Sequence, residues 1–336
     1  MGRSRITARD VAAAAGVSQP TVSRVFADNA RVDPATRDRV MRAAGDLGYR
    51  PNRLARAMSR GRSHTVGLIV AGLDNPFYAD AVDRFSRALQ ARGYHAVIVT
   101  ASNDAADLDG QVRDILAMQV DGLILASVSI DNALARAASQ AGVPLVLFNR
   151  GQHGTDLPTV TSANHDGGRR AAHLLVDRGH RRIAHVSGWQ GSATGVDRQR
   201  GFLDGMADRG VAPLACIDSR YDRDRARRAV HDLFGADVTP DAIFAGNDLI
   251  AFAVLSALRH DLGLSVPRDV SVLGYDDVAM AAWPEFDLTT FRQPAGRMVD
   301  ATIGMLMDLI DGRPVPDRLT EIRSDLIERG SVRAAP

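Results

Sequence analysis

The chain has 336 residues, of which 45% are hydrophobic and 24% are charged, proportions typical of globular proteins. No apolar run approaches the roughly 18 residues that a membrane helix needs, and the N-terminus lacks the apolar stretch of a secretion signal. The single cysteine, Cys216, excludes an internal disulfide and a cysteine-ligated zinc site. We therefore expect a cytoplasmic protein, and its length favours more than one domain.

The net charge of +1 conceals an uneven distribution along the chain. Residues 1–64 contain thirteen arginines and five aspartates and carry +8, whereas the remaining 272 residues carry −7. A basic module on a mildly acidic body indicates that the module alone has a polyanionic partner.

A pair of short helices is predicted near the N-terminus. Thr7 and Asp10 have the spacing of a capping box at the start of the first helix. Gly16 can adopt the left-handed conformation that ends it. Ser18 can cap a second helix, whose first turn tolerates Pro20 because no hydrogen bond is lost there. The expected apolar face of the first helix consists of Val11, Ala14 and Ala15.

The second helix of this pair presents a polar face. Gln19 and Arg24 carry side chains that can make paired hydrogen bonds to adenine and guanine edges, and Thr21 and Ser23 lie beside them. A helix, a glycine turn and a polar second helix form the helix-turn-helix pattern of DNA-binding modules. The alternative interpretation is an ordinary helical hairpin.

A third helix and a basic segment follow the pair. Asp33 and Pro34 form a helix start, and Gly48 ends the helix, whose buried stripe would be Val40, Ala43, Ala44 and Leu47. Pro51 can open a further short helix with Leu54, Ala55 and Met58 on one side. Such a segment needs a partner to be helical; otherwise it is a plain basic linker.

From His64 onward, apolar strands alternate with amphipathic helices. This rhythm predicts parallel sheets covered on both faces, and the number of repeats indicates two similar lobes with a cleft between them. The expected strands are 66–70, 95–100, 122–126, 144–148, 183–187, 215–218, 242–245 and 270–274, and the expected helices end near residues 93, 118, 141, 178, 210, 234 and 262.

Ligands bind such sheets at the carboxyl ends of the strands. These ends carry a mixture of amides, carboxylates and aromatic rings, with an arginine further on. The set suits a polyhydroxylated ligand, whose hydroxyls need paired donors and acceptors. The residues include 71–77, Ser127, Asn149, Arg150, 189–194, Arg198, Tyr221, Asn247, Asp248 and 275–277.

Signatures of enzymes are missing from the sequence. There is no dinucleotide fingerprint, phosphate-binding loop or nucleophile elbow, and we expect neither a cofactor nor a metal. His180 and His185 share no helical face. Asp276 and Asp277 could be paired acids, but adjacent side chains usually point apart, which favours one hydrogen-bonding group in the cleft and one structural group.

Taken together, these motifs resemble the lactose/galactose repressor family of bacterial transcription regulators. The resemblance implies a small all-α helix-turn-helix domain (1–50), a hinge helix and linker (51–63), and a two-lobed core (64–336) like that of periplasmic sugar-binding proteins. The first lobe would hold about 64–162 and 293–322, and the second about 163–292 and the C-terminal segment. The matching runs include DVAAAAGVSQPTVSRVF, LGYRPNRLARAM, GLIVAGLDNPFY, GHRRIAHVSG, IFAGNDLIAF, VPRDVSVLGYDD and LTTFRQP.

The resemblance also assigns site residues. Gln19, Pro20 and Arg24 match base-reading positions. Ser18, Thr21, Ser23 and Asn52 match positions near phosphates or groove edges. Thr7 and Arg53 complete the DNA-binding set. Ala55 and Met58 match the hinge positions that enter the minor groove, although most of the family has leucine at Met58. The effector-binding set is Asp74, Phe77, Ser127, Asn149, Trp189, Arg198, Tyr221, Asn247, Asp276 and Gln293.

The sequence thus predicts a homodimeric repressor that binds pseudo-palindromic operator DNA under the control of a small effector, most simply a sugar or sugar derivative. A purine or a protein co-regulator could take the place of the sugar. Two other classes stay open: a sugar-binding module without a regulatory role, and an α/β enzyme of sugar metabolism.

Overall fold

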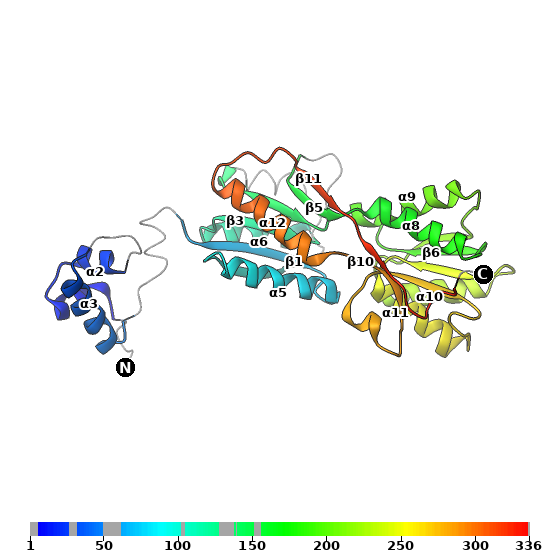
Figure 1. Cartoon of the computed structure of the whole chain (residues 1–336), viewed down its shortest axis with the longest axis horizontal. Helices are drawn as coiled ribbons and strands as arrows, with labels where there is room; N and C mark the ends of the chain where they lie inside the picture. Colours follow the sequence, from blue (N-terminus) through cyan, green and yellow to red (C-terminus); the bar gives the residue numbers. More distant parts are fainter. Residues whose placement is uncertain are drawn as a thin grey trace. The chain divides into compact units, whose positions relative to one another are not determined.

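The chain forms two compact units, Met1–Ser63 and His64–Pro336 (Figure 1). The computed structural model describes residues 6–26, 32–49, 62–101, 105–127, 138, 140–150 and 156–334, with the backbone alone for 105–109. Within these ranges, no helix is both long and apolar enough to cross a membrane.

Three helices make up the described part of the N-terminal unit: α1 (Ala8–Ala15), α2 (Gln19–Val25) and α3 (Pro34–Asp46). The expected apolar face of α1 was wrong at one position. Ala14 is exposed, and Ala12 is buried in its place. The side of α1 that packs against the other helices is therefore the one that carries Val11, Ala12 and Ala15. The buried side chains are Val11, Ala12, Ala15, Val22, Val25, Val40 and Ala44.

The predicted helix boundaries near the N-terminus are confirmed by their hydrogen bonds. The Asp10 carboxylate accepts from the backbone N–H of Thr7 at 2.8 Å and from its hydroxyl at 2.7 Å. Gly16 has a φ of 62°, in the left-handed region that glycine adopts without strain. Ser18 Oγ accepts from the N–H of Thr21 at 3.4 Å, which caps α2.

Two six-stranded sheets form the core of the larger unit. Neighbouring strands run parallel, except for the antiparallel pair β10 and β12. The first sheet has the order β11 (Leu319–Ile322), β5 (Thr159–Ser162), β4 (Leu145–Phe148), β3 (Gly122–Ala126), β1 (Thr65–Ala71), β2 (His95–Ala101). The second has the order β12 (Asp325–Ile327), β10 (Thr289–Arg292), β9 (Ser271–Asp276), β8 (Ala242–Ala245), β6 (Ile183–Ser187), β7 (Ala215–Asp218).

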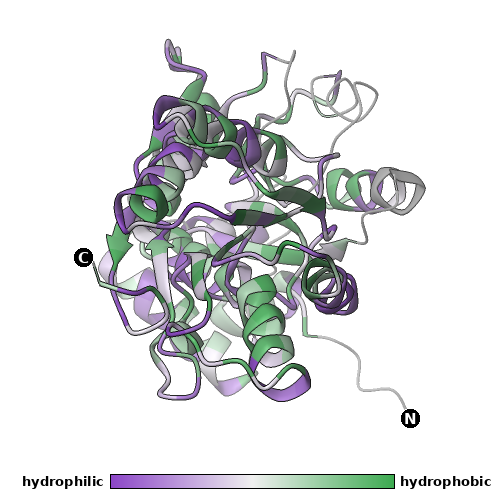
Figure 2. Cartoon of the chain, turned by 90° about the vertical axis from the view of Figure 1, so that its right-hand side faces the viewer, coloured by the Kyte–Doolittle hydropathy of each residue, from purple (hydrophilic) through white to green (hydrophobic). Residues whose placement is uncertain are grey.

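Helices cover the faces of both sheets and define two lobes. The first lobe has α5 (Pro76–Gln90), α6 (Ala105–Ala117) and α12 (Ala295–Ile310). The second has α8 (Asn164–Asp177), α9 (Ala193–Asp208), α10 (Arg223–Phe234), α11 (Asp248–Ser256) with a π-helical turn η1 (Ala257–Asp261), and a short 3-10 helix η2 (Ala279–Ala282). Figure 2 shows hydrophobic residues along the strands and hydrophilic residues on outward parts of the helices.

The chain passes between the two sheets three times. It leaves the first lobe after β5, returns to it between β10 and α12, and leaves it again between β11 and β12. The last two passages are the orange-to-red segments of Figure 1. Since strands from distant parts of the sequence complete each sheet, the two lobes form one folding unit with a shared boundary.

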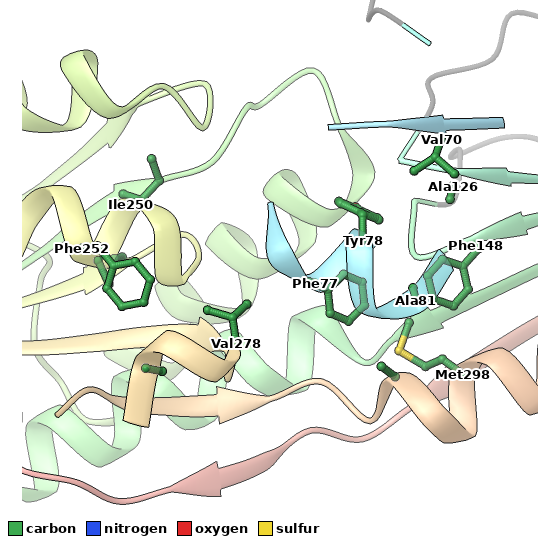
Figure 3. Close-up of a cluster of buried hydrophobic side chains, with 14 of the residues drawn as sticks. Val70, Phe77, Tyr78, Ala81, Ala126, Phe148, Ile250, Phe252, Val278 and Met298 are labelled. Carbon is green, nitrogen blue, oxygen red and sulfur yellow. The ribbon is translucent and has the colours of Figure 1, made fainter. Parts of the chain in front are cut away.

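Buried side chains of both lobes meet in one large hydrophobic cluster. Figure 3 shows part of it, with Phe77, Phe148 and Met298 in the first lobe and Ile250 and Phe252 in the second. This continuity fixes the strand ends of the two sheets opposite each other.

Candidate functional site

A cavity of about 360 Å³ lies between the lobes, within the size range of small-molecule sites. Its walls come from the carboxyl ends of β1, β3 and β4 on one side and of β6, β7, β8 and β9 on the other. The lining residues are Gly72, Asp74, Asn75, Tyr78, Ser127, Asn149, Arg150, Trp189, Thr194, Arg198, Arg220, Tyr221, Asn247, Leu249, Asp276 and Gln293.

The structure brings nine of the ten expected effector-binding residues to this cavity: Asp74, Ser127, Asn149, Trp189, Arg198, Tyr221, Asn247, Asp276 and Gln293. The tenth, Phe77, lies in the hydrophobic core instead. It is 4% exposed, and its ring stacks on Phe148 with centroids 6.1 Å apart (Figure 3). Successive residues of a helix point about 100° apart, so Tyr78 of α5 lines the cavity while Phe77 faces the sheet.

Sequence reasoning missed Tyr78, Arg220 and Leu249. Tyr78 could have been found, because a tyrosine beside a strand end is suited to a site with one apolar side and one polar side. Its hydroxyl accepts from Asn149 Nδ2 at 3.1 Å. Burial raises the pKa of Tyr78, so the group stays a neutral hydroxyl. Arg220 and Leu249 carried no such signal.

Arg198 of α9 is the central cation of the cavity and is 3% exposed. Its guanidinium donates to Asn164 Oδ1 at 2.6 Å and to the backbone oxygen of Gly246. It also lies 3.5 Å above the ring centre of Tyr275. These contacts on three sides hold the guanidinium in one place, which is what a preorganised recognition group requires.

Asp276 supplies the buried carboxylate opposite Arg198. It accepts from Gln293 Nε2 at 2.5 Å and from Asn75 Nδ2 at 3.0 Å. Burial raises the pKa of Asp276, and the nearby Arg198 opposes that rise. Asn75 belongs to the first lobe and Asp276 to the second, so this hydrogen bond closes the cavity across the boundary.

The neighbouring carboxylates point elsewhere. Asp277 pairs with Arg292 at 2.6 Å and Arg329 at 2.7 Å, as expected for a structural group. Asp248 is fully buried and accepts from the N–H of Val278 at 2.9 Å and from Thr290 Oγ1 at 2.6 Å. Burial, with the Asp276 charge nearby, raises the pKa of Asp248. Neither group forms a pair of acids with Asp276 that faces the cavity.

Asn247 combines two roles that the sequence had offered as alternatives. Its Oδ1 caps α11 by accepting from the N–H of Ile250 at 3.0 Å, and the residue lines the cavity. The cap fixes the rotamer, so the side-chain nitrogen is the atom that remains for a ligand.

The cavity also contains buried acceptors. Among the described residues, Asn149 Oδ1 and Gln293 Oε1 are buried and have no protein partner. An unmet buried acceptor is costly, so both sites favour a ligand that carries hydroxyl donors. Across the cavity, the Arg150 guanidinium lies 5.6 Å from the ring centre of Trp189, a second contact between the lobes.

Unusual backbone conformations gather at this cavity. Ser127, Asn149, Arg220, Tyr221 and Asp276 have φ values of 60°, 63°, 52°, 59° and 126°. Residues other than glycine rarely adopt this region, and each such residue costs about 1 kcal/mol or more. Strain of this kind concentrates at functional sites, where the surrounding fold imposes it.

The second candidate surface is the outer face of α2. Gln19, Pro20, Ser23 and Arg24 are exposed on it, and Thr21 is half-buried. Thr7 and Ser18 are exposed at the starts of α1 and α2. Asn52, Arg53, Ala55 and Met58 lie outside the described residues.

No cluster of metal-ligating side chains occurs in the ranges that the structure describes.

Residues 7–52 match the model of the lacI family of bacterial regulatory proteins, and residues 172–332 match a periplasmic binding protein-like domain.

Relatives match the chain over nearly its whole length. The transcriptional repressor PurR of Pectobacterium carotovorum is 31% identical over 98% of both chains. A complex of the transcriptional regulator CelR with cellobiose is 34% identical over 97% of this chain and 100% of its own, with a TM-score of 0.74. The Lac repressor dimer bound to operator and the anti-inducer ONPF is 26% identical over 98% and 100%, with a TM-score of 0.90. The chain belongs to the lacI family of bacterial regulatory proteins.

Proposed function

We propose that this chain is a homodimeric transcriptional repressor whose operator affinity is controlled by a sugar or sugar derivative bound between the lobes of the core. The observation that carries the proposal is the arrangement of Arg198, Asn247 and Asp276 around a cavity with buried acceptors. Hydroxyl groups both donate and accept, so a polyol satisfies such a mixed set without carrying a charge of its own.

Aromatic rings support the same ligand class. Trp189 and Tyr221 line the cavity and offer flat surfaces to the apolar face of a sugar ring. The solved CelR structure contains cellobiose, which makes disaccharides the first compounds to examine.

The N-terminal unit supports DNA as the second partner. It combines a capped pair of helices with the charge of +8 in residues 1–64. We propose that Gln19, Pro20 and Arg24 read bases and that Ser18, Thr21 and Ser23 position the module on phosphates. A dimer would present two such helices to a pseudo-palindromic operator, in the cytoplasm where that DNA lies.

A thermal-shift panel of mono- and disaccharides, polyols, sugar acids and purines tests the effector. We expect a sugar to raise the melting temperature in a concentration-dependent way and to change the fluorescence anisotropy of a labelled operator complex. A purine that shifts both signals while no sugar does would contradict the proposed ligand class.

Arg198→Ala is the decisive variant. Because the guanidinium lines the cavity of the core, its loss should abolish the effect of the sugar on operator binding while operator affinity without sugar stays intact. Arg228→Ala, which removes an exposed arginine of α10, serves as the control and should respond as the wild type does. An unchanged response in Arg198→Ala would refute its role.

We also propose that the bound sugar is not turned over. Chromatography of a sugar incubated with the protein should return the compound unchanged; a product that accumulates in proportion to protein concentration would favour the enzyme alternative.

A further inference from the structure

Three buried hydroxyl groups meet where the chain passes between the lobes. Ser162 ends β5, Ser324 lies between β11 and β12, and Tyr275 belongs to β9. The Ser162 Oγ lies 2.7 Å from the Ser324 Oγ and 3.0 Å from the Tyr275 hydroxyl, and the latter two are 2.9 Å apart. Each hydroxyl can donate to one neighbour and accept from the other. The triangle therefore satisfies all three groups, none more than 1% exposed.

The triangle joins two of the three passages. The N–H of Ala163, just after β5, donates to the backbone oxygen of Ile322 at the end of β11 at 3.0 Å. Arg170 of α8 donates to the backbone oxygen of Ser324 at 2.6 Å. These bonds cross-link the two passages where they enter the second lobe, so they restrain the rotation of one passage relative to the other.

The same set reaches the cavity through Arg198. Its guanidinium covers the Tyr275 ring and donates to Asn164 Oδ1, and Asn164 Nδ2 donates to the backbone oxygen of Ser162 at 2.9 Å. Gly167 makes room for Tyr275, since a Cβ at 167 would lie 2.5 Å from its hydroxyl oxygen. One cavity side chain thus touches two residues that hold the triangle.

We propose that Ser162, Tyr275 and Ser324 form a latch that fixes the angle between the lobes, and that Asn164 and Tyr275 are positioning residues that connect the latch to Arg198. A ligand that binds the guanidinium therefore acts on a group that is in direct contact with both positioning residues. The latch consists of protein groups alone and needs no ligand, so it goes beyond the proposed sugar response.

Tyr275→Phe tests the latch, because it removes one hydroxyl and keeps the ring beneath Arg198. Hydrogen exchange of the Ala163 amide should become about tenfold faster, the factor that corresponds to the loss of one buried hydrogen bond. Asn164→Asp keeps the acceptor for Arg198 but loses the donor to Ser162, and the same acceleration is expected.

Thr302→Val is the matched control. It removes a buried hydroxyl that donates to the backbone oxygen of Met298 within α12 at 2.8 Å, and the Ala163 amide should exchange as in the wild type. An unchanged rate in Tyr275→Phe overturns the latch. Equal acceleration in Tyr275→Phe and Thr302→Val also overturns it, since the amide would then exchange through global unfolding.

A second measurement follows the lobes themselves. The chain has two tryptophans, so Trp283→Phe leaves Trp189, on which Arg150 of the other lobe rests. In this background, Tyr275→Phe should increase the acrylamide quenching of Trp189, and Thr302→Val should not. Equal quenching in all three proteins would show that the triangle does not hold the lobes. Both measurements use the protein without ligand, so their outcome is independent of whether any sugar binds.

Discussion

At the scale of single residues, adjacent side chains in this protein have different tasks. Asp276 faces the cavity and bridges the lobes through Asn75, whereas Asp277 is held between Arg292 and Arg329. The sequence predicted this division because adjacent strand residues point to opposite sides. It could not place Phe77 and Tyr78, because the rotation of α5 about its axis depends on contacts with Phe148 that no local pattern records.

The two aspartates give a paired prediction. Asp276→Asn should weaken sugar binding by at least about tenfold, since a charge-assisted hydrogen bond is lost. It should lower the free energy of unfolding by only about 1 kcal/mol, because the amide can replace one of the two acceptor oxygens that face Asn75 and Gln293. Asp277→Asn should leave sugar binding intact and lower the free energy of unfolding by roughly 3 kcal/mol, because it leaves Arg329 without its buried partner. Titration calorimetry and urea unfolding separate the two effects; a reversed pattern would exchange the assigned roles.

At the scale of elements, patterns of apolar residues located most of the core. The predicted strands at 122–126, 183–187, 215–218 and 242–245 match β3, β6, β7 and β8. Strand β5 and the elements α12, β10, β11 and β12 were not predicted, although the resemblance implied that 293–322 belongs to the first lobe. Strands β11 and β12 have only four and three residues and no buried side chain, so they depend on pairing with distant strands. The predicted helix that ends near residue 141 falls largely outside the described residues.

His185 of β6 makes the packing of the second lobe sensitive to acid. It is 1% exposed, stacks on Phe244 and donates to the Phe244 backbone oxygen at 2.8 Å. Burial lowers the pKa of His185 to about 4. In the unfolded chain His185 binds a proton below about pH 6.5, whereas in the folded chain it does so only below about pH 4. The free energy of unfolding therefore decreases as the pH falls from 6.5 toward 4.

His185→Gln removes this titration and keeps a donor for the carbonyl. Relative to the variant, the wild type should lose about 3 kcal/mol of unfolding free energy between pH 7 and pH 4. Urea unfolding at four pH values measures the difference. Burial also lowers the pKa of His180 to about 4, but His180 is present in both proteins and cancels. Parallel curves would mean that His185 titrates alike in the folded and unfolded states.

At the scale of the whole molecule, the charges divide the two binding tasks. Residues 1–64 carry +8 and the rest of the chain −7, so attraction to DNA is confined to the N-terminal unit. The sequence alone established this division, because it requires only a count of the charged residues in each part of the chain. The cavity, by contrast, is lined by hydrogen-bonding groups inside the protein, where salt penetrates little.

Salt should therefore separate the two activities. Raising the salt concentration from 50 to 200 mM should weaken DNA binding by roughly a thousandfold or more, because the arginines release counterions from phosphates. Binding of a neutral sugar should change by less than about twofold over the same range. Anisotropy with labelled duplex DNA and calorimetry with the sugar provide the two series. A flat DNA series would exclude an electrostatic contact by the basic unit.

The three passages between the lobes also affect how the protein is made. The first lobe lacks α12 and β11 until residues 295–322 have been synthesised, and the second lacks β12 until residue 327. Neither sheet is therefore complete until the last few dozen residues of the chain have been made. The described buried residues of the N-terminal helices pack against one another, and all of them have been synthesised long before the lobes are complete. On a nascent chain, the proposed DNA-reading module would thus be complete well before the proposed effector cavity exists.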